Sequence, residues 1–404
     1  MNFSISKARF WDGLSEALEA LTSPLDVREG RFVEPGGALP EGVPAPIELA
    51  DRVIMPGLID AHVHLELDPK LRTPRQQLAV PDRERREAMA RRAGQMLAAG
   101  ITTTRDCGGG LHLEHALRAE VDSWARPGPR VLCCGRPITT PGGHCHFWGG
   151  EVAGDAEIEA KVAAEIEAGS DWIKVMATGG VFTPGTKARD TQFDRAGLAR
   201  VVSAAGQGGR SVAAHCHGTE GIANAVRAGV RTIEHASFAG PDGFGTALDR
   251  DLMREMSERE LWVSPTVNAG WGKRVIGNDG EPTPFFRRLS SCLRAQRDAG
   301  IRFIASTDAG IPGVAHHDLV AGLKAFARFA DLRPVEVLRA ATSESARALG
   351  LEHETGRIAP GLSADFLVLE GDPLEDLAAL DDPEWVVIRG RWLDRDARRV
   401  LASA

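Results

Sequence analysis

The sequence contains no tyrosine among its 404 residues, which excludes any chemistry that needs a phenol side chain. It has no apolar run near the ~20 residues that span a bilayer, and its first residues lack the apolar stretch of a secretory signal. With 43% hydrophobic residues and no segment of low complexity, the chain is not disordered. These absences predict a globular, cytoplasmic protein with no membrane partner.

An excess of positive charge is also missing. Lysine and arginine total 48 against 56 aspartates and glutamates, and the formal net charge is −8. Because the basic residues are scattered, no footprint for nucleic acid is present. We therefore expect a small-molecule substrate and no nucleic-acid partner, while assembly into a homo-oligomer stays open.

Cysteine is scarce as well. The six cysteines form no C-x-x-C pair, so neither a disulfide framework, a zinc ribbon nor a thioredoxin-like motif is expected. Reduced thiols in a reducing compartment are the simplest interpretation.

Short β-rich runs that end in polar residues alternate with helical patterning through most of the chain. The runs cover residues 52–62, 101–106, 130–134, 171–177, 211–215, 230–235, 261–266 and 301–308. Helical patterning is clearest over residues 82–99, 157–168, 195–205, 220–228, 249–259 and 284–299. Eight strands that alternate with helices predict an α/β fold, a (β/α)8 TIM barrel over residues 56–359.

The two ends of the chain have a different pattern, with short strand-like pieces broken by glycine and proline. Such pieces cover residues 28–33, 35–40, 364–369 and 384–388. Strands from both ends could pair, which predicts a small composite β-sandwich domain made of residues 1–55 and 360–404.

Side chains that can bind metal stand at the ends of four predicted strands. His62 and His64 are separated by one residue, so in a strand they point to the same side. His215, His235 and Asp308 end three other predicted strands. Barrel active sites form at these carboxyl ends, and imidazoles with a carboxylate suit zinc. The pattern therefore predicts a metal centre.

Lys174 lies inside the apolar run 171–177, where an isolated ammonium group is unfavourable. A neutral amine can react with CO2 to form a carbamate, an anion that resembles a carboxylate and can bridge two cations. Two alternatives remain open: a buried Lys174–Asp308 ion pair without metal, and Lys174 as a Schiff-base nucleophile.

Residues 53–64, V-I-M-P-G-L-I-D-A-H-V-H, resemble the first-strand signature of the amidohydrolase superfamily, of the binuclear type with a carboxylated lysine. The other strand ends match in order, and the resemblance covers nearly the full length, including the tail at 356–366. The M-A-T-G-G phrase after Lys174 is similar to the branch of imidazolonepropionase-like proteins and Xaa-Pro dipeptidases.

The resemblance implies two divalent metal ions, with zinc as the first expectation. The first ion would be held by His62, His64 and Asp308, the second by His215 and His235, with carboxylated Lys174 as the bridge. It also implies hydrolysis of an amide-type C–N bond in a small N-acyl amino acid, dipeptide or cyclic amide. The nucleophile would be a metal-bridging hydroxide, with Asp308 as general base.

Further candidates lie near these ligands. His217 shares a strand face with His215 and could donate a hydrogen bond to the developing oxyanion as a catalytic residue. His144 and His146 lie in the loop after the third strand, and in related dipeptidases a histidine at the place of His144 helps to bind substrate. Arg189 could anchor a substrate carboxylate. Apolar walls could come from Phe147, Trp148, Phe182 and Trp271.

One departure from the family concerns Phe193. Dipeptidase-like relatives place a tyrosine there that supports the oxyanion, and losing one such donor lowers the rate by ~10²–10³. Either His217 or His144 replaces this donor, or the substrate that contacts Phe193 is not a peptide.

Two other functions remain in view. The first is a mononuclear deaminase or imidazolonase; such relatives usually lack the lysine and keep a glutamate soon after the fifth-strand histidine, where this chain has Glu220. The second is a barrel that serves as a non-catalytic scaffold, as occurs when ligands are lost. No ligand is missing here.

Overall fold

A computed structural model describes residues 1–34 and 45–403. The predicted strand-like piece at 35–40 lies outside the described residues. Eight parallel strands form two sheets, in the orders β10-β9-β8 and β11-β12-β13-β14-β15. They are β8 (Leu58–Val63), β9 (Ile101–Asp106), β10 (Arg130–Cys133), β11 (Trp172–Met176), β12 (Ser211–Gly218), β13 (Thr232–Ala239), β14 (Trp262–Ser264) and β15 (Arg302–Phe303).

Backbone hydrogen bonds also join the edges of the two sheets. On one side, Ile138 N donates to Lys174 O and Met176 N donates to Ile138 O, each at 2.8 Å. On the other side, Ala61 N donates to Ala305 O and Asp308 N donates to His62 O, each at 2.9 Å. The first and last parallel strands therefore lie side by side.

The strand predicted over residues 52–62 is in fact two strands. β7 (Val53–Pro56) pairs with β16 (Phe366–Leu369), whereas β8 joins the parallel sheet. Gly57 lies between them, and its N–H donates to Asp365 O. A glycine is needed there because a Cβ would lie 2.2 Å from Thr102 Oγ1. The chain passes from one sheet to the other at this close contact.

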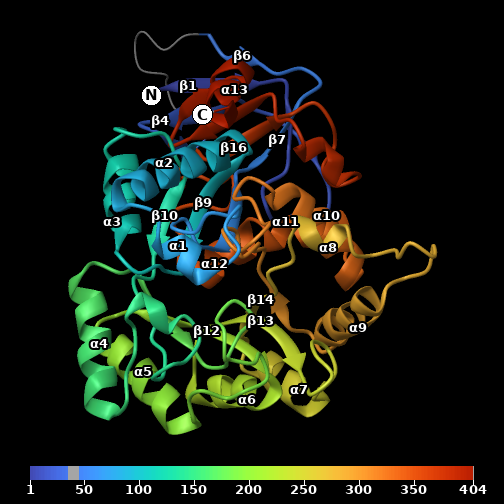
Figure 1. Ribbon diagram of the computed structural model, residues 1–404. Coiled ribbons are helices and arrows are strands. Elements are labelled where there is room, and N and C mark those ends of the chain that lie inside the picture. The colour runs from blue at the N-terminus through green and yellow to red at the C-terminus, as the bar shows by residue number, and fades with distance from the viewer. Residues whose placement is uncertain (35–44, 404) are drawn as a thin grey trace.

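Helices fill the connections between the parallel strands and also follow the last of them, β15 (Figure 1). They are α1 (Pro74–Leu78), α2 (Asp82–Ala98), α3 (Leu113–Asp122), α4 (Asp155–Glu167), α5 (Arg195–Gln207), α6 (Thr219–Ala228), α7 (Arg250–Glu258), α8 (Ala269–Gly272), α9 (Pro284–Asp298), α10 (Leu319–Ala330), α11 (Pro334–Ala340) and α12 (Ser343–Leu349). Two 3-10 turns add η1 (His146–Trp148) and η2 (Leu377–Leu380). All six helices predicted from the sequence are present, with ends shifted by a few residues.

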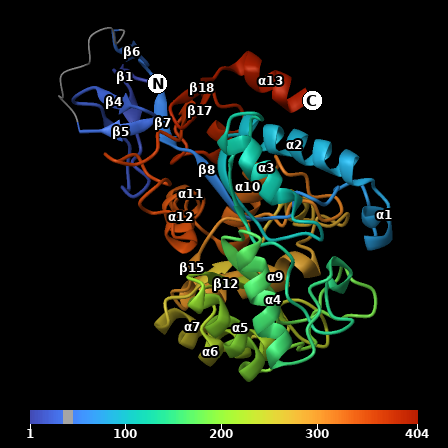
Figure 2. The same ribbon diagram turned by 90° about the vertical axis from the view of Figure 1, so that its left-hand side faces the viewer.

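Strands from both ends of the chain form two further sheets at one end of the molecule, where both termini lie (Figures 1 and 2). Their orders are β5-β4-β1-β6 and β18-β17-β16-β7-β2-β3. The strands not yet given are β1 (Phe3–Ser6), β2 (Arg9–Phe10), β3 (Glu19–Ala20), β4 (Leu25–Arg28), β5 (Arg31–Val33), β6 (Ile47–Glu48), β17 (Trp385–Ile388) and β18 (Arg391–Leu393). Phe3, Phe32 and Phe366 pack between the strands of the two ends.

The chain ends in a helix, α13 (Arg395–Ser403), which the strand-like pattern of the tail did not indicate. Arg398 anchors it by donating from Nε to Ala98 O at the end of α2, at 2.8 Å. All six cysteines are buried and free. Among the residues that the structure describes, no helix is both long enough and apolar enough to span a membrane.

Candidate metal centre

The ligands predicted at the strand ends converge on one cavity of about 440 Å³. His62 and Lys174 lie on β8 and β11, His215 and His235 on β12 and β13, and His64 and Asp308 just after β8 and β15. All six line this cavity. They meet because parallel strands place their carboxyl ends at the same edge.

The donor atoms fall into two sets that could each hold a metal ion. One set is His62, His64 and Asp308, and the other is His215, His217 and His235. A third set shares His62 and adds Cys107 and Glu234, but Glu234 is already bound by an arginine. The first set contains the residues that the resemblance implied for one ion, and the second contains those for the other together with His217; Lys174 belongs to neither set.

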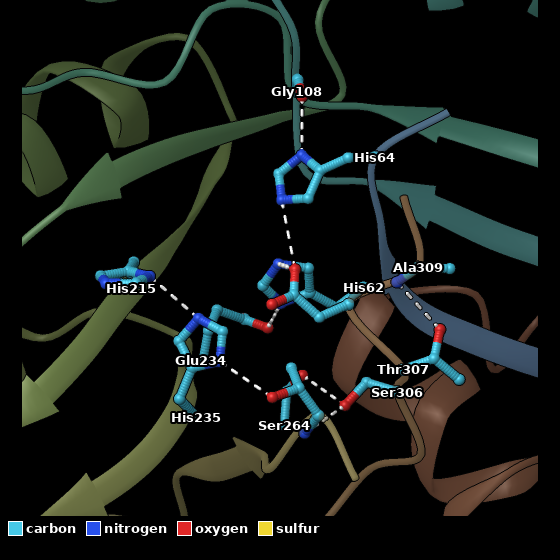
Figure 3. Close-up of polar contacts among 12 residues, drawn as sticks. His62, His64, Gly108, His215, Glu234, His235, Ser264, Ser306, Thr307 and Ala309 are labelled. Carbon is cyan, nitrogen blue, oxygen red and sulfur yellow. Dashed lines mark hydrogen bonds and ion pairs between the residues drawn. The ribbon is translucent and has the colours of Figure 1, made fainter. Parts of the chain in front are cut away.

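Hydrogen bonds orient the rings of the first set (Figure 3). His62 Nδ1 lies 2.8 Å from Glu234 Oε2, and His64 Nδ1 lies 2.7 Å from Gly108 O. A carboxylate and a carbonyl can only accept, so both Nδ1 atoms carry protons and the Nε2 atoms are left as ligand atoms. Each Nε2 lies 3.4 Å from Asp308 Oδ1.

The second set is oriented in the same way. His215 Nε2 donates to Gly179 O at 3.1 Å, which leaves His215 Nδ1 as the ligand atom. His235 Nδ1 meets Thr266 Oγ1 at 2.9 Å, and His235 Nε2 lies 2.9 Å from His215 Nδ1 (Figure 3). Burial and the neighbouring histidines lower the pKa of both rings well below its ordinary value. Neutral rings with converging lone pairs fit a metal ion.

Within the part of the chain that the structure describes, Lys174 has no carboxylate partner. Its side chain is 1% exposed, and the polar neighbour recorded for Nζ in the described chain is His62 Nε2, at 3.3 Å. No Lys174–Asp308 ion pair is present among the described residues, so the alternative based on that pair is wrong. A buried amine that lies beside candidate metal ligands and outside any ion pair of the described residues fits carboxylation.

The sequence did not reveal the group that holds His62 in place. Glu234 accepts from Arg105 Nη2 at 2.7 Å, and both side chains are fully buried. Thr232 Oγ1 also donates to Glu234, at 2.5 Å. Glu234 stands opposite His215 in the register of β12 and β13, and the signal available in the sequence was only its position in the same predicted strand, directly before His235.

We expect Glu234→Ala to lower the free energy of unfolding by about 3–5 kcal/mol, because it leaves Arg105 buried without a counter-charge. Urea unfolding of metal-free protein measures this directly. Asp251→Ala, which breaks an exposed pair with Arg254, is the matched control and should be close to wild type. A change below about 1 kcal/mol for Glu234→Ala would contradict the role of the pair.

Two further predicted histidines line the cavity. His217 Nδ1 lies 2.8 Å from Ser237 Oγ, and its ring stacks on His235 with centroids 4.4 Å apart. The His144 ring lies 4.6 Å from that of His215, and its buried Nδ1 has no hydrogen-bond partner among the described residues. Burial lowers the pKa of His217 to about 4 and that of His144 to about 3. Both are therefore neutral at pH 7.

The other three residues predicted to bind substrate do not line this cavity. Phe193 is 6% exposed and packs in the hydrophobic core. Arg189 is exposed beside Asp190, and His146 packs against Phe147 in η1. Spacing in the sequence placed them on the correct loops, but the direction of each side chain depends on how the loop folds.

The walls of the cavity are largely apolar. Trp148, Phe182 and Trp271 lie there as predicted, while Phe147 does not. The structure adds residues that no sequence motif marked: Leu67, Arg72, Phe244, Asn268 and Ile311.

The α/β fold and the clustered candidate ligands define a class of hydrolases that is generally metal-dependent. Residues 53–393 match the Amidohydrolase family, and the chain belongs to that family of enzymes.

Comparison with known proteins agrees with this assignment. The chain is 26% identical over 368 residues to the ochratoxinase of Aspergillus niger, covering 83% of this chain and 73% of that protein. It is 26% identical over 361 residues to the imidazolonepropionase of Chloroflexus aggregans, covering 81% and 78%. The crystal structure of a Xaa-Pro dipeptidase with bound methionine in its active site is similar with a TM-score of 0.83 and 26% identity, covering 98% of this chain and all of that one.

Proposed function

We propose that this enzyme hydrolyses an amide-type C–N bond in a small molecule at a centre of two divalent metal ions. The observation that carries the proposal is the meeting of two ligand sets beside the unpaired Lys174 in one cavity. Relatives named for dipeptide and imidazolone substrates support this bond type.

His62, His64 and Asp308 would hold one ion, and His215 and His235 the other, with carboxylated Lys174 between them. Nitrogen and oxygen donors in these numbers suit zinc. When bound, the ions would polarise the scissile carbonyl and make a water molecule easier to deprotonate.

Asp308 is the proposed proton carrier. Burial would raise its pKa, but His62 and His64 more than offset this, so the pKa lies below its ordinary value and the group is an ionised base. It accepts a proton as water adds to the carbonyl carbon, and it returns the proton to nitrogen as the C–N bond breaks. A carboxylic acid and an amine are the products.

His217 and His144 are the proposed hydrogen-bond donors to the carbonyl oxygen. Both line the cavity beside the second ligand set, and a neutral imidazole keeps one N–H to donate. They take the place of the hydroxyl donor that Phe193 cannot supply.

The fold supports this chemistry if the two parallel sheets act as one closed (β/α)8 barrel over residues 56–359. The hydrogen bonds that join both pairs of edges support closure. We further propose that residues 1–55 and 360–404 form a separate β-sandwich domain, since their strands share one sheet.

We expect protein loaded with divalent metal to hydrolyse at least one member of a panel of N-acyl amino acids, dipeptides and lactams, measured as amine released. Asp308→Asn should lower kcat by about 10³-fold or more, since several kcal/mol of transition-state stabilisation are lost. Arg189→Ala, outside the cavity, should be unchanged and serves as control. Deamination of amino-heterocycles with no amide turned over would contradict the proposal.

A further inference from the structure

The loop between β8 and α1 presents Arg72 to the cavity. Arg72 is exposed at the end of a loop, whereas the other charged residues that line the cavity, Lys174 and Asp308, lie deep within it. Among the described residues that line the cavity, Arg72 is therefore the one cation outside the metal centre.

Two glutamines of α1 fix the backbone that carries Arg72. Gln76 Oε1 accepts from the N–H groups of Arg72 and Thr73, at 2.8 and 3.1 Å, and completes a capping box with Thr73. Gln77, which is 5% exposed, accepts from Asp68 N and donates to Asp68 O and Leu71 O. The arginine thus extends from an ordered loop.

The guanidinium of Arg72 has no ion-pair partner within residues 1–34 and 45–403. The carboxylates of the same loop, Glu66 and Asp68, pair with Arg85 and Arg92 instead. Lys70 and Arg75 also have no ion-pair partner among the described residues, but they do not line the cavity. An exposed guanidinium that lines an apolar cavity is suited to one planar anion, because its paired N–H groups can donate to the two oxygens of a carboxylate. A phosphate, with a charge of about −1.5 to −2, would need further cations.

The walls below Arg72 indicate what accompanies that anion. Trp148, Phe182, Phe244 and Trp271 line the same cavity, with Trp148 against His64 and Phe244 against His217. Aromatic walls of this kind bind flat apolar groups.

We propose that Arg72 binds the carboxylate of the substrate, so that the enzyme acts on amides with a free carboxylate and an apolar side chain, such as N-acyl derivatives of aromatic amino acids. The inference rests on the proposed amide hydrolysis and names the substrate class for the same cavity. Arg72 takes the role that the sequence had suggested for Arg189, which does not line the cavity.

The test compares 3-phenylpropanoate with 3-phenylpropan-1-ol, two probes that share the ring and contain no hydrolysable bond. Calorimetry on the metal-loaded protein should give a dissociation constant about tenfold lower for the acid. Arg72→Ala should remove this difference by weakening the acid alone, Arg72→Lys should keep part of it, and Arg189→Ala should match wild type.

An Arg72→Ala protein that binds the acid as wild type does would overturn the proposal, because the carboxylate then sits at another group. Equal weakening of the binding of both probes would also overturn it, because Arg72 would then only shape the loop. A wild-type protein that binds the acid no more tightly than the alcohol would overturn it as well. With N-acetyl-L-phenylalanine as substrate, Arg72→Ala should raise KM about tenfold and leave kcat nearly unchanged.

The experiments distinguish failure of the proposed amide hydrolysis from failure of the proposed role of Arg72. If no amide is hydrolysed but Arg72 still governs binding of the acid, the proposed function fails and the role of Arg72 stands. If amides are hydrolysed and Arg72→Ala changes neither binding nor KM, only the role of Arg72 fails.

Discussion

Replacement of Lys174 by alanine is expected to lower kcat by about 10³-fold or more, because the proposed carbamate on this side chain joins the two ligand sets. Far-UV circular dichroism of the metal-free protein should stay close to wild type, since Lys174 has no ion pair among the described residues. Steady-state release of amine from the best panel substrate is the measurement.

Two controls separate this role from damage to the fold. Lys187→Ala, at an exposed lysine outside the cavity, should leave turnover unchanged. Formate or propionate added to the Lys174→Ala protein should restore part of the activity, because a small carboxylic acid can enter the space and supply the missing anion. Full activity of the unsupplemented Lys174→Ala protein would rule out the bridging lysine.

The second prediction with a large expected effect concerns the number of bound metal ions. Protein purified without chelators should carry two divalent ions per chain, measured by elemental analysis, and complete removal by a chelator should abolish turnover until metal is returned. The His215→Ala/His235→Ala double variant loses two of the three histidines of the second ligand set, while the first set remains complete. That protein should carry one ion.

A single ion per wild-type chain would favour the mononuclear deaminase or imidazolonase. Undiminished turnover by metal-free protein would contradict the proposed centre altogether. As the matched control, His146→Ala removes a histidine outside the cavity and should keep both ions.

Much of the centre could be predicted from the sequence, because each ligand belongs to a local pattern. His62 and His64 share a side of the chain through the two-residue repeat of a strand. His215 and His235 follow apolar strands whose carboxyl ends must meet in a parallel sheet, and the structure places all of them around one cavity. The local periodicity of the strands was enough to predict that these residues meet.

The residues that the sequence did not reveal act across long separations. Glu234 lies 172 residues from His62 and 129 from Arg105, and no pattern within one strand links the three. The run 52–62 was predicted as one strand because it is largely apolar, although the predicted domain boundary fell inside it; its two halves belong to different sheets.

The sequence by itself determined the alternation of strands and helices and the type of ligand at each strand end, since both follow from neighbouring residues. Only the tertiary structure decided which loop side chains enter the cavity. Arg72 and Phe244 line it, while Arg189 and Phe193 do not, because a loop directs its side chains through contacts with other loops and helices. The hydrogen bonds of Gln76 fix the loop of Arg72, which is the one cation of the described lining outside the metal centre.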